Sequence, residues 1–136
     1  MRSLIKTPTY ENEAVIDYFC AKNPAYEQAA AQELFKDLLS WLLFNQKRAH
    51  ENKKTHLFGP LLDLDEMWHA FILHTRAYTE FCLQYLGEYL HHDIEPVGYE
   101  HLIREEELRG YLEDCFQFLG IDWVSRRFAL ALEAGY

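Results

Sequence analysis

Side chains that commonly bind metal ions gather in one segment of the chain, residues 63–93. This segment, DLDEMWHAFILHTRAYTEFCLQYLGEYLHHD, contains four of the seven histidines, one of the three cysteines and several carboxylates. Imidazole nitrogens, thiolates and carboxylate oxygens are the usual ligands of zinc and iron in proteins. The sequence therefore predicts a candidate site in this segment, and it leaves the reaction at that site open.

The first part of this candidate site is an acidic pair followed by a histidine. Asp65 and His69 are four residues apart and Glu66 and His69 are three apart, so each pair lies on one face of a helix. Either pair can offer one carboxylate oxygen and one imidazole nitrogen to the same ion. The alternative role of His69 is structural: a hydrogen bond to Asp65 or to a loop carbonyl that orders the start of the helix.

A third ligand has to come from elsewhere, and His91 and His92 follow shortly after the predicted end of the helix at Gly87. Residues 69 and 87 lie about 27 Å apart along a straight helix that rises about 1.5 Å per residue, and the chain from Gly87 to His91 cannot span that distance. The histidine pair reaches His69 only if the helix ends early or bends. Otherwise His91 and His92 order the loop or interact with the helix C-terminus.

If the helix stays straight, the candidate residues split between two sites. The far end then holds one cluster: Cys82, His91, His92 and Asp93. The near end takes its partners from other segments: Glu33, Asp37, His50 or His56. The sequence does not choose between these geometries. Glu66 and His69 also have the Glu-x-x-His spacing of di-iron helix bundles, but the chain contains no second copy of that spacing.

The elements that position these residues are predicted to be helices. The chain has 136 residues, of which 49% are hydrophobic and 15% aromatic, with six glycines and four prolines. Apolar residues recur at intervals of three and four, and no segment alternates with period two. We expect an all-α fold, a compact bundle of about five to six helices that forms a single domain over residues 1–136.

The helix boundaries are predicted from caps, proline and glycine. Asn23 is expected to cap a long helix that Pro24 opens, and Asp63 with Glu66 has the spacing of a capping box. Helix-ending glycines are expected at three places: Gly87, Gly110 and Gly120. The predicted helices are Asn12–Ala21, Pro24–His50, Leu64–Leu86, Tyr99–Leu108, Tyr111–Leu119 and Trp123–Ala134.

One apolar stripe on the third predicted helix is expected to face the long second helix. Its members recur at helical spacing: Met67, Phe71, His74, Tyr78, Phe81 and Tyr85. His74 lies among aromatic residues, where a packed and hydrogen-bonded imidazole is more common than a metal ligand.

Composition argues against several classes of function. The formal net charge is −9, and residues 69–136 carry 5 basic and 12 acidic side chains, so a nucleic-acid ligand is not expected. The sequence contains no apolar run of roughly 18 residues that could span a membrane. An N-terminus without signal-peptide character predicts a cytoplasmic protein, as do three widely spaced cysteines: Cys20, Cys82 and Cys115. A Gly-rich phosphate loop is also missing, so no nucleotide cofactor is expected.

The segment from Asp65 onward resembles a known family. The run DEMWHAFIL is followed by Thr75, Tyr78, Phe81-Cys82, Gly87 and His91-His92. This pattern looks like that of the glycine-rich-domain-containing-protein-like family, although many members carry a second histidine at the position of Phe71. The resemblance implies a helical module similar to stand-alone bacterial proteins, and it transfers no catalytic role to any residue.

Two functions are consistent with these observations. The favoured one is a binding or adaptor module for a protein partner. Its anchors would be exposed aromatic residues: Trp41, Tyr89 or Trp123. The second is a metal-binding protein or metal-dependent enzyme that holds zinc or iron with His69, an acidic partner and His91 or His92. A buried, fully hydrogen-bonded His69 without an open cleft beside it would count against this second function.

Overall fold

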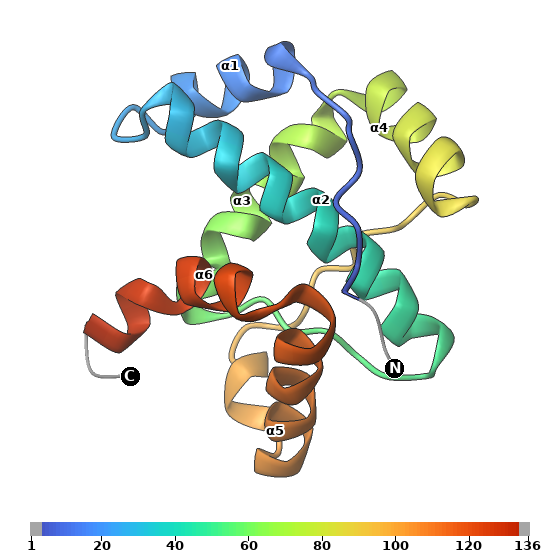
Figure 1. Ribbon diagram of the computed structural model, residues 1–136, viewed down its shortest axis with the longest axis vertical. Helices are drawn as coiled ribbons and strands as arrows, with labels where there is room; N and C mark the ends of the chain where they lie inside the picture. The colour runs from blue at the N-terminus through green and yellow to red at the C-terminus, as the bar shows by residue number, and fades with distance from the viewer. Residues whose placement is uncertain (1–3, 134–136) are drawn as a thin grey trace.

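The long helix α2 (Gln28–His50) runs through the middle of the molecule, and the other helices pack around it (Figure 1). The structure, a computed structural model, describes residues 4–133, except for the side chains of Glu100 and of residues 129–133. Both α1 (Glu13–Lys22) and α3 (Leu62–Leu73) contact α2, whose Leu34, Leu38 and Trp41 are buried. The helix that carries Asp65 and His69 is therefore held against the centre of the core.

All the regular secondary structure in residues 4–133 is helical, which confirms the predicted all-α bundle. The remaining α-helices are α4 (Thr75–Phe81), α5 (Glu105–Asp114) and α6 (Ile121–Glu133). Short 3-10 turns (Gly59–Leu61, Tyr99–Leu102) and π turns (Cys82–Leu86, Cys115–Leu119) extend or connect them. None of these described helices combines the length and the apolarity that crossing a bilayer requires.

The first two helices confirm one predicted helix and correct the start of the next. The side chain of Asn12 caps α1 and accepts a hydrogen bond from the backbone N–H of Val15 at 3.2 Å. Asn23 closes α1 and does not open α2: its backbone N–H and its side-chain amide donate to the carbonyl of Phe19, at 2.9 and 3.0 Å. The last carbonyls of a helix lack helical partners, and Asn23 satisfies one of them. The predicted helix start at Pro24 is wrong, because α2 begins only at Gln28.

The predicted third helix is interrupted at His74, whose backbone angles (φ −87°, ψ 68°) are not helical. The imidazole Nδ1 of His74 donates to the carbonyl of Ala70 at 2.8 Å, and its ring packs edge-on against Tyr18. His74 is thus packed and hydrogen-bonded, as expected. Beyond this break, α4 takes a new direction (Figure 1) and the following π turn ends at Gly87, whose left-handed φ of 78° favours glycine.

The predicted capping box at Asp63 and Glu66 is wrong. Helix α3 begins at Leu62, directly after a 3-10 turn, and no side chain caps it. The carboxylate of Asp63 instead accepts a hydrogen bond from the hydroxyl of Tyr26. Burial, together with this carboxylate, raises the pKa of Tyr26, so its hydroxyl stays protonated. The bond ties the start of α3 to the turn between α1 and α2.

The C-terminal boundaries were predicted only in part. Gly110 lies inside α5 and does not separate two helices, and the expected helix Tyr99–Leu108 divides into a 3-10 turn and the first part of α5. Gly120 ends a helical segment as predicted, with a left-handed φ of 92°. Helix α6 starts at Ile121, before the predicted Trp123, and the predicted last residue, Ala134, lies outside the described residues.

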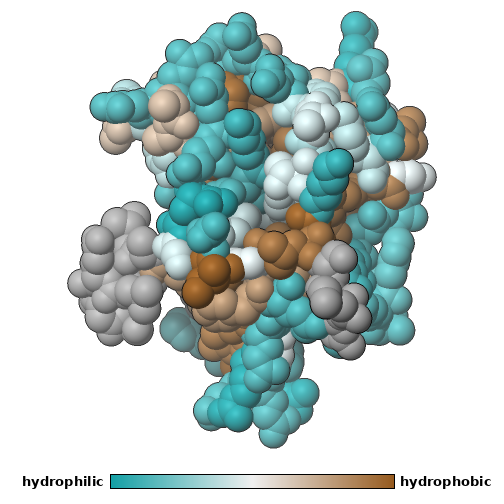
Figure 2. Space-filling view, in the orientation of Figure 1, coloured by the Kyte–Doolittle hydropathy of each residue, from teal (hydrophilic) through white to brown (hydrophobic). Residues whose placement is uncertain are grey.

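Two of the aromatic residues predicted to be exposed belong to the core. Trp41 and Trp123 are 1% and 3% exposed, so neither can anchor a partner. Their indole N–H groups are satisfied inside the protein, at 3.1 Å from the hydroxyl of Tyr111 and at 3.0 Å from the carbonyl of Asp37. Figure 2 shows hydrophilic residues over most of one face of the molecule and hydrophobic ones gathered across its middle.

The buried hydroxyl of Tyr111 links two parts of the core, and its removal should be costly. It accepts from Trp41 and donates to the carbonyl of His56 at 2.7 Å. We expect Tyr111→Phe to lower the free energy of unfolding by about 1–3 kcal/mol, because both partners stay buried without a hydrogen bond. Urea unfolding measures this. Tyr18→Phe is the control, since its hydroxyl has no hydrogen-bond partner among the described residues, and an equal loss there would contradict the prediction.

The buried imidazole of His56 makes stability depend on pH. Burial lowers its pKa, and the nearby Arg48 cation lowers it further, so the folded state holds the neutral form. In the unfolded chain the pKa is about 6.5. As the pH falls below that value, the unfolded chain takes up a proton on His56 while the folded chain does not. The free energy of unfolding therefore falls until the pH reaches the lower pKa of the folded state.

We therefore expect His56→Gln to flatten the fall in the free energy of unfolding between pH 7 and pH 5, which urea titrations in metal-free buffer can follow. His91→Gln, a change of an exposed histidine, is the matched control. If both variants flatten the pH dependence equally, burial of His56 is not its cause.

Candidate metal centre

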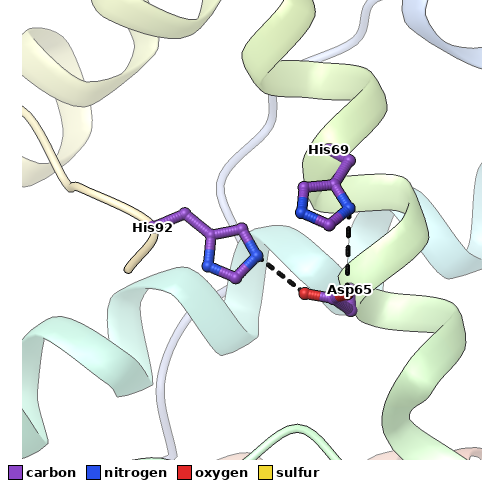
Figure 3. A group of neighbouring side chains, drawn as sticks. All are labelled: Asp65, His69 and His92. Carbon is purple, nitrogen blue, oxygen red and sulfur yellow. Dashed lines mark hydrogen bonds and ion pairs between the residues drawn. The ribbon is translucent and has the colours of Figure 1, made fainter. Parts of the chain in front are cut away.

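The break at His74 brings the two parts of the predicted site together. Helix α3 carries Asp65 and His69, and the loop that follows Gly87 returns beside α3 with His92 (Figure 3). Of the two geometries that the sequence left open, the structure therefore has the one in which the histidine pair can reach His69. The helix ends early and changes direction, which was the condition for a single site.

Asp65, His69 and His92 converge with their ligand atoms facing one another (Figure 3). Asp65 Oδ1 lies 2.7 Å from His92 Nε2, and Asp65 Oδ2 lies 3.7 Å from His69 Nδ1. When one ligand atom is taken from each of the three residues, all three atoms lie within 4.8 Å of one another. The two imidazole rings lie 4.8 Å apart, at an angle of 26°. Two imidazoles and one carboxylate thus occupy one small volume.

The carboxyl group of Asp65 is held in its ionised form. Its partial burial raises its pKa, but the hydrogen bond from His92 and the charge of the neighbouring His69 outweigh that effect. The net result is a pKa below the ordinary value. Asp65 therefore presents an anionic oxygen donor to both histidines near neutral pH.

The position of His92 is set by the indole of Trp68. The His92 ring stacks on Trp68 at 3.9 Å between ring centroids, with an interplanar angle of 9°. The N–H of Trp68 donates to the hydroxyl of Tyr78 at 3.0 Å, and that hydroxyl donates to the carbonyl of Leu90. Burial raises the pKa of Tyr78, so its hydroxyl stays a donor. The loop is therefore tied to α3 and α4 two residues before His92.

The cluster opens on a cleft of about 990 Å³. The side chain of His69 is 49% exposed, whereas those of Asp65 and His92 are 26% and 13% exposed. The cleft walls combine aromatic and aliphatic side chains with a few charged ones. His69 is neither buried nor fully hydrogen-bonded, so the condition that would count against a metal site is not met.

Two of the five predicted site residues lie outside the cluster. Glu66 is exposed, because consecutive helix positions point about 100° apart and Asp65 already faces the histidines. His91 is exposed too, and its ring contacts Tyr89 at 4.7 Å, whereas the next residue, His92, turns towards α3. The predicted site therefore keeps Asp65, His69 and His92.

The other residues that a two-site geometry would have required are not members of the cluster. Asp37 pairs with Arg126 at 2.8 Å and Glu33 with Arg127 at 3.6 Å. His50 pairs with Glu88, His56 is buried beside Tyr99 and Tyr111, and Cys82 is buried in the core. Because none of these residues joins Asp65, His69 and His92, the arrangement of the described residues is that of the single-site alternative.

Sequence reasoning missed the supporting role of Trp68 and Tyr78. From the sequence, Trp68 was named only as part of the run DEMWHAFIL, and Tyr78 was named in that run's family pattern and as a member of the apolar stripe. The signal that could have indicated their role is chemical: a buried indole N–H and a buried hydroxyl need partners. Which partners they find depends on the break at His74, and the helical pattern did not predict that break.

Comparison with known proteins identifies a family for this chain. A family model described as UCP032817-like matches residues 2–115, a range that includes the whole cluster. No curated protein and no solved structure matches the chain. The resemblance to the glycine-rich-domain-containing-protein-like family is wrong, because the matching model is a different one. The chain belongs to the UCP032817-like family.

Proposed function

We propose that Asp65, His69 and His92 bind one divalent metal ion, zinc or iron(II), beside the cleft. One observation supports this above all: three ligand atoms of the right kind, from α3 and from a separate loop, lie within 4.8 Å of one another. Glu66 and His91 are not part of the proposed site. Two histidines and one carboxylate are a common set of protein ligands for catalytic zinc and for non-haem iron.

The spacing of the donor atoms suits such an ion. Ligand atoms about 2.1 Å from a tetrahedral metal are about 3.4 Å from each other. Asp65 Oδ1 lies 2.7 Å from His92 Nε2, Asp65 Oδ2 lies 3.7 Å from His69 Nδ1, and the three ligand atoms all lie within 4.8 Å of one another. Side-chain movements of about one to two ångströms would bring the atoms to the spacing of a tetrahedral site, and the metal would replace the hydrogen bond between His92 and Asp65.

The open side of the site favours a catalytic over a purely structural ion. Structural zinc sites are closed by four protein ligands, whereas catalytic sites keep a position for water or substrate. Here three ligands converge and the exposed His69 borders the cleft. With zinc, a bound water would be activated for hydrolysis, and with iron(II) the site would support oxygen chemistry.

The second candidate function is an adaptor module for a protein partner. Of the three aromatic anchors predicted for it, only Tyr89 is exposed, at 39%. We therefore place metal binding first. A cytoplasmic location stays a prediction, consistent with free cysteines at all three positions: Cys20, Cys82 and Cys115.

Elemental analysis of tag-free protein, purified without chelators, tests the proposal directly. We expect close to one zinc or iron per chain. His69→Ala and His92→Ala should each weaken binding of that metal by more than about 100-fold, because each removes a direct ligand, whereas loss of an outer-shell partner costs 10- to 100-fold.

His91→Ala is the matched control, since it removes a neighbouring histidine that lies outside the cluster. It should keep both the metal content and the affinity of the wild type. A folded wild-type protein that contains no metal and is unchanged by added zinc or iron(II) would refute the proposal.

The hydroxyl of Tyr78 should tune the site from a distance, because it ties Leu90 and Trp68 together next to His92. We expect Tyr78→Phe to weaken metal affinity by about 3- to 10-fold, less than the loss of a group that bonds a ligand directly, because Tyr78 acts on His92 only through Trp68 and Leu90. Competition with a chelator of known affinity measures this. Tyr85→Phe, on the turn after α4, is the control, and equal affinities of Tyr78→Phe and wild type would contradict the proposed support.

A further inference from the structure

A strap formed by residues 93–98 borders the cleft directly after His92. It has no regular secondary structure, yet its surroundings hold it at both ends. His92 bonds Asp65 before it, and the hydroxyl of Tyr99 lies 3.3 Å from His56 Nδ1 after it. Gly98, at φ 84° and ψ 5°, closes a type II turn in which the N–H of Tyr99 donates to the carbonyl of Pro96.

This strap presents apolar side chains to water at the edge of the cleft. Ile94 is 88% exposed and Val97 is 107% exposed, the highest values among the exposed large hydrophobic residues of the described chain. Both line the cleft, together with the half-exposed Tyr89. Apolar side chains gathered at a cleft favour a ligand that covers them, because burying apolar surface is favourable.

The charge of the cleft depends on the metal. Two lysines (Lys53, Lys54) and three carboxylates (Asp65, Asp93, Glu95) line it, so its formal charge is −1 without metal and +1 with a divalent ion, histidines counted as neutral. Lys53 lies 3.5 Å from Glu51, whereas Lys54 lies over the Tyr99 ring at 5.4 Å, with no described carboxylate oxygen within 4.0 Å. The metal-loaded cleft should therefore attract an anion and the metal-free cleft should not.

We infer that the ligand of this site is a small organic acid: its carboxylate binds the metal held by Asp65, His69 and His92, and its apolar body lies against Ile94 and Val97. The inference rests on the proposed metal site. A cleft of about 990 Å³ has the size of a small-molecule site. The anionic oxygen donor matches the charge of the loaded cleft, and the apolar body matches the strap.

Calorimetry with three probes tests this inference on zinc-loaded protein. Hexanoate carries both parts of the proposed ligand, acetate carries the carboxylate alone, and 1-hexanol carries the chain without the charge. We expect hexanoate to bind at least about tenfold more tightly than acetate, since each buried methylene adds affinity. Hexanol should bind at least about tenfold more weakly than hexanoate, because it lacks the anionic donor, and metal-free protein should lose hexanoate binding.

The variant pair Ile94→Asn/Val97→Asn should bring the affinity for hexanoate down to that for acetate, while zinc and acetate binding stay as in the wild type. The matched control is Leu73→Asn/Leu83→Asn, two leucines of 63% and 60% exposure outside the cleft lining, which should behave as wild type.

Equal affinity for hexanoate and acetate, or equal hexanoate binding with and without zinc, would overturn this inference and leave metal binding intact. A protein that takes up no zinc would instead overturn the metal site, and this inference with it.

Discussion

The indole of Trp68 is the point at which the helices and the candidate site meet. Its ring stacks on His92 and contacts Trp41 of α2 edge-on at 5.4 Å, while its N–H donates to Tyr78. A buried N–H without a partner costs free energy, so Trp68 favours the one arrangement in which Tyr78 is in reach. Tyr78 in turn bonds Leu90 and places His92 opposite Asp65. The site therefore depends on the packing of one core side chain.

The polar groups of the cluster can be satisfied in two ways. Without metal, His92 donates to the ionised Asp65, so neither group is buried without a partner. With metal, the ion would take the place of that hydrogen bond. The hydrophobic core lies in α1–α4, the 3-10 turn Gly59–Leu61, the two π turns, α5 and α6 and does not include the cluster, so its packing would not depend on a bound metal as that of a zinc finger does. Variants of the three ligands should accordingly remain folded.

Much of the fold could be predicted because it rests on local patterns. Apolar spacing indicated helices, and Gly87 and Gly120 end helical segments with the left-handed φ that glycine tolerates. The first helix was expected from Asn12 onward, and the side chain of Asn12 caps it. The failures occurred where a distant contact outweighed a local preference. Asp63 bonds Tyr26 from another segment and caps nothing, and His74 interrupts a pattern that is otherwise continuously helical.

For the site, the sequence by itself determined the pair of Asp65 and His69, because four residues along a helix place two side chains on the same face whatever surrounds it. Only the tertiary structure decided that His92 and not His91 completes the cluster. Adjacent loop residues differ little in composition or spacing, and the choice between them depends on which ring can stack on Trp68 after the chain has turned at His74. That turn is stabilised by contacts between segments far apart in the sequence, and a local pattern does not contain them.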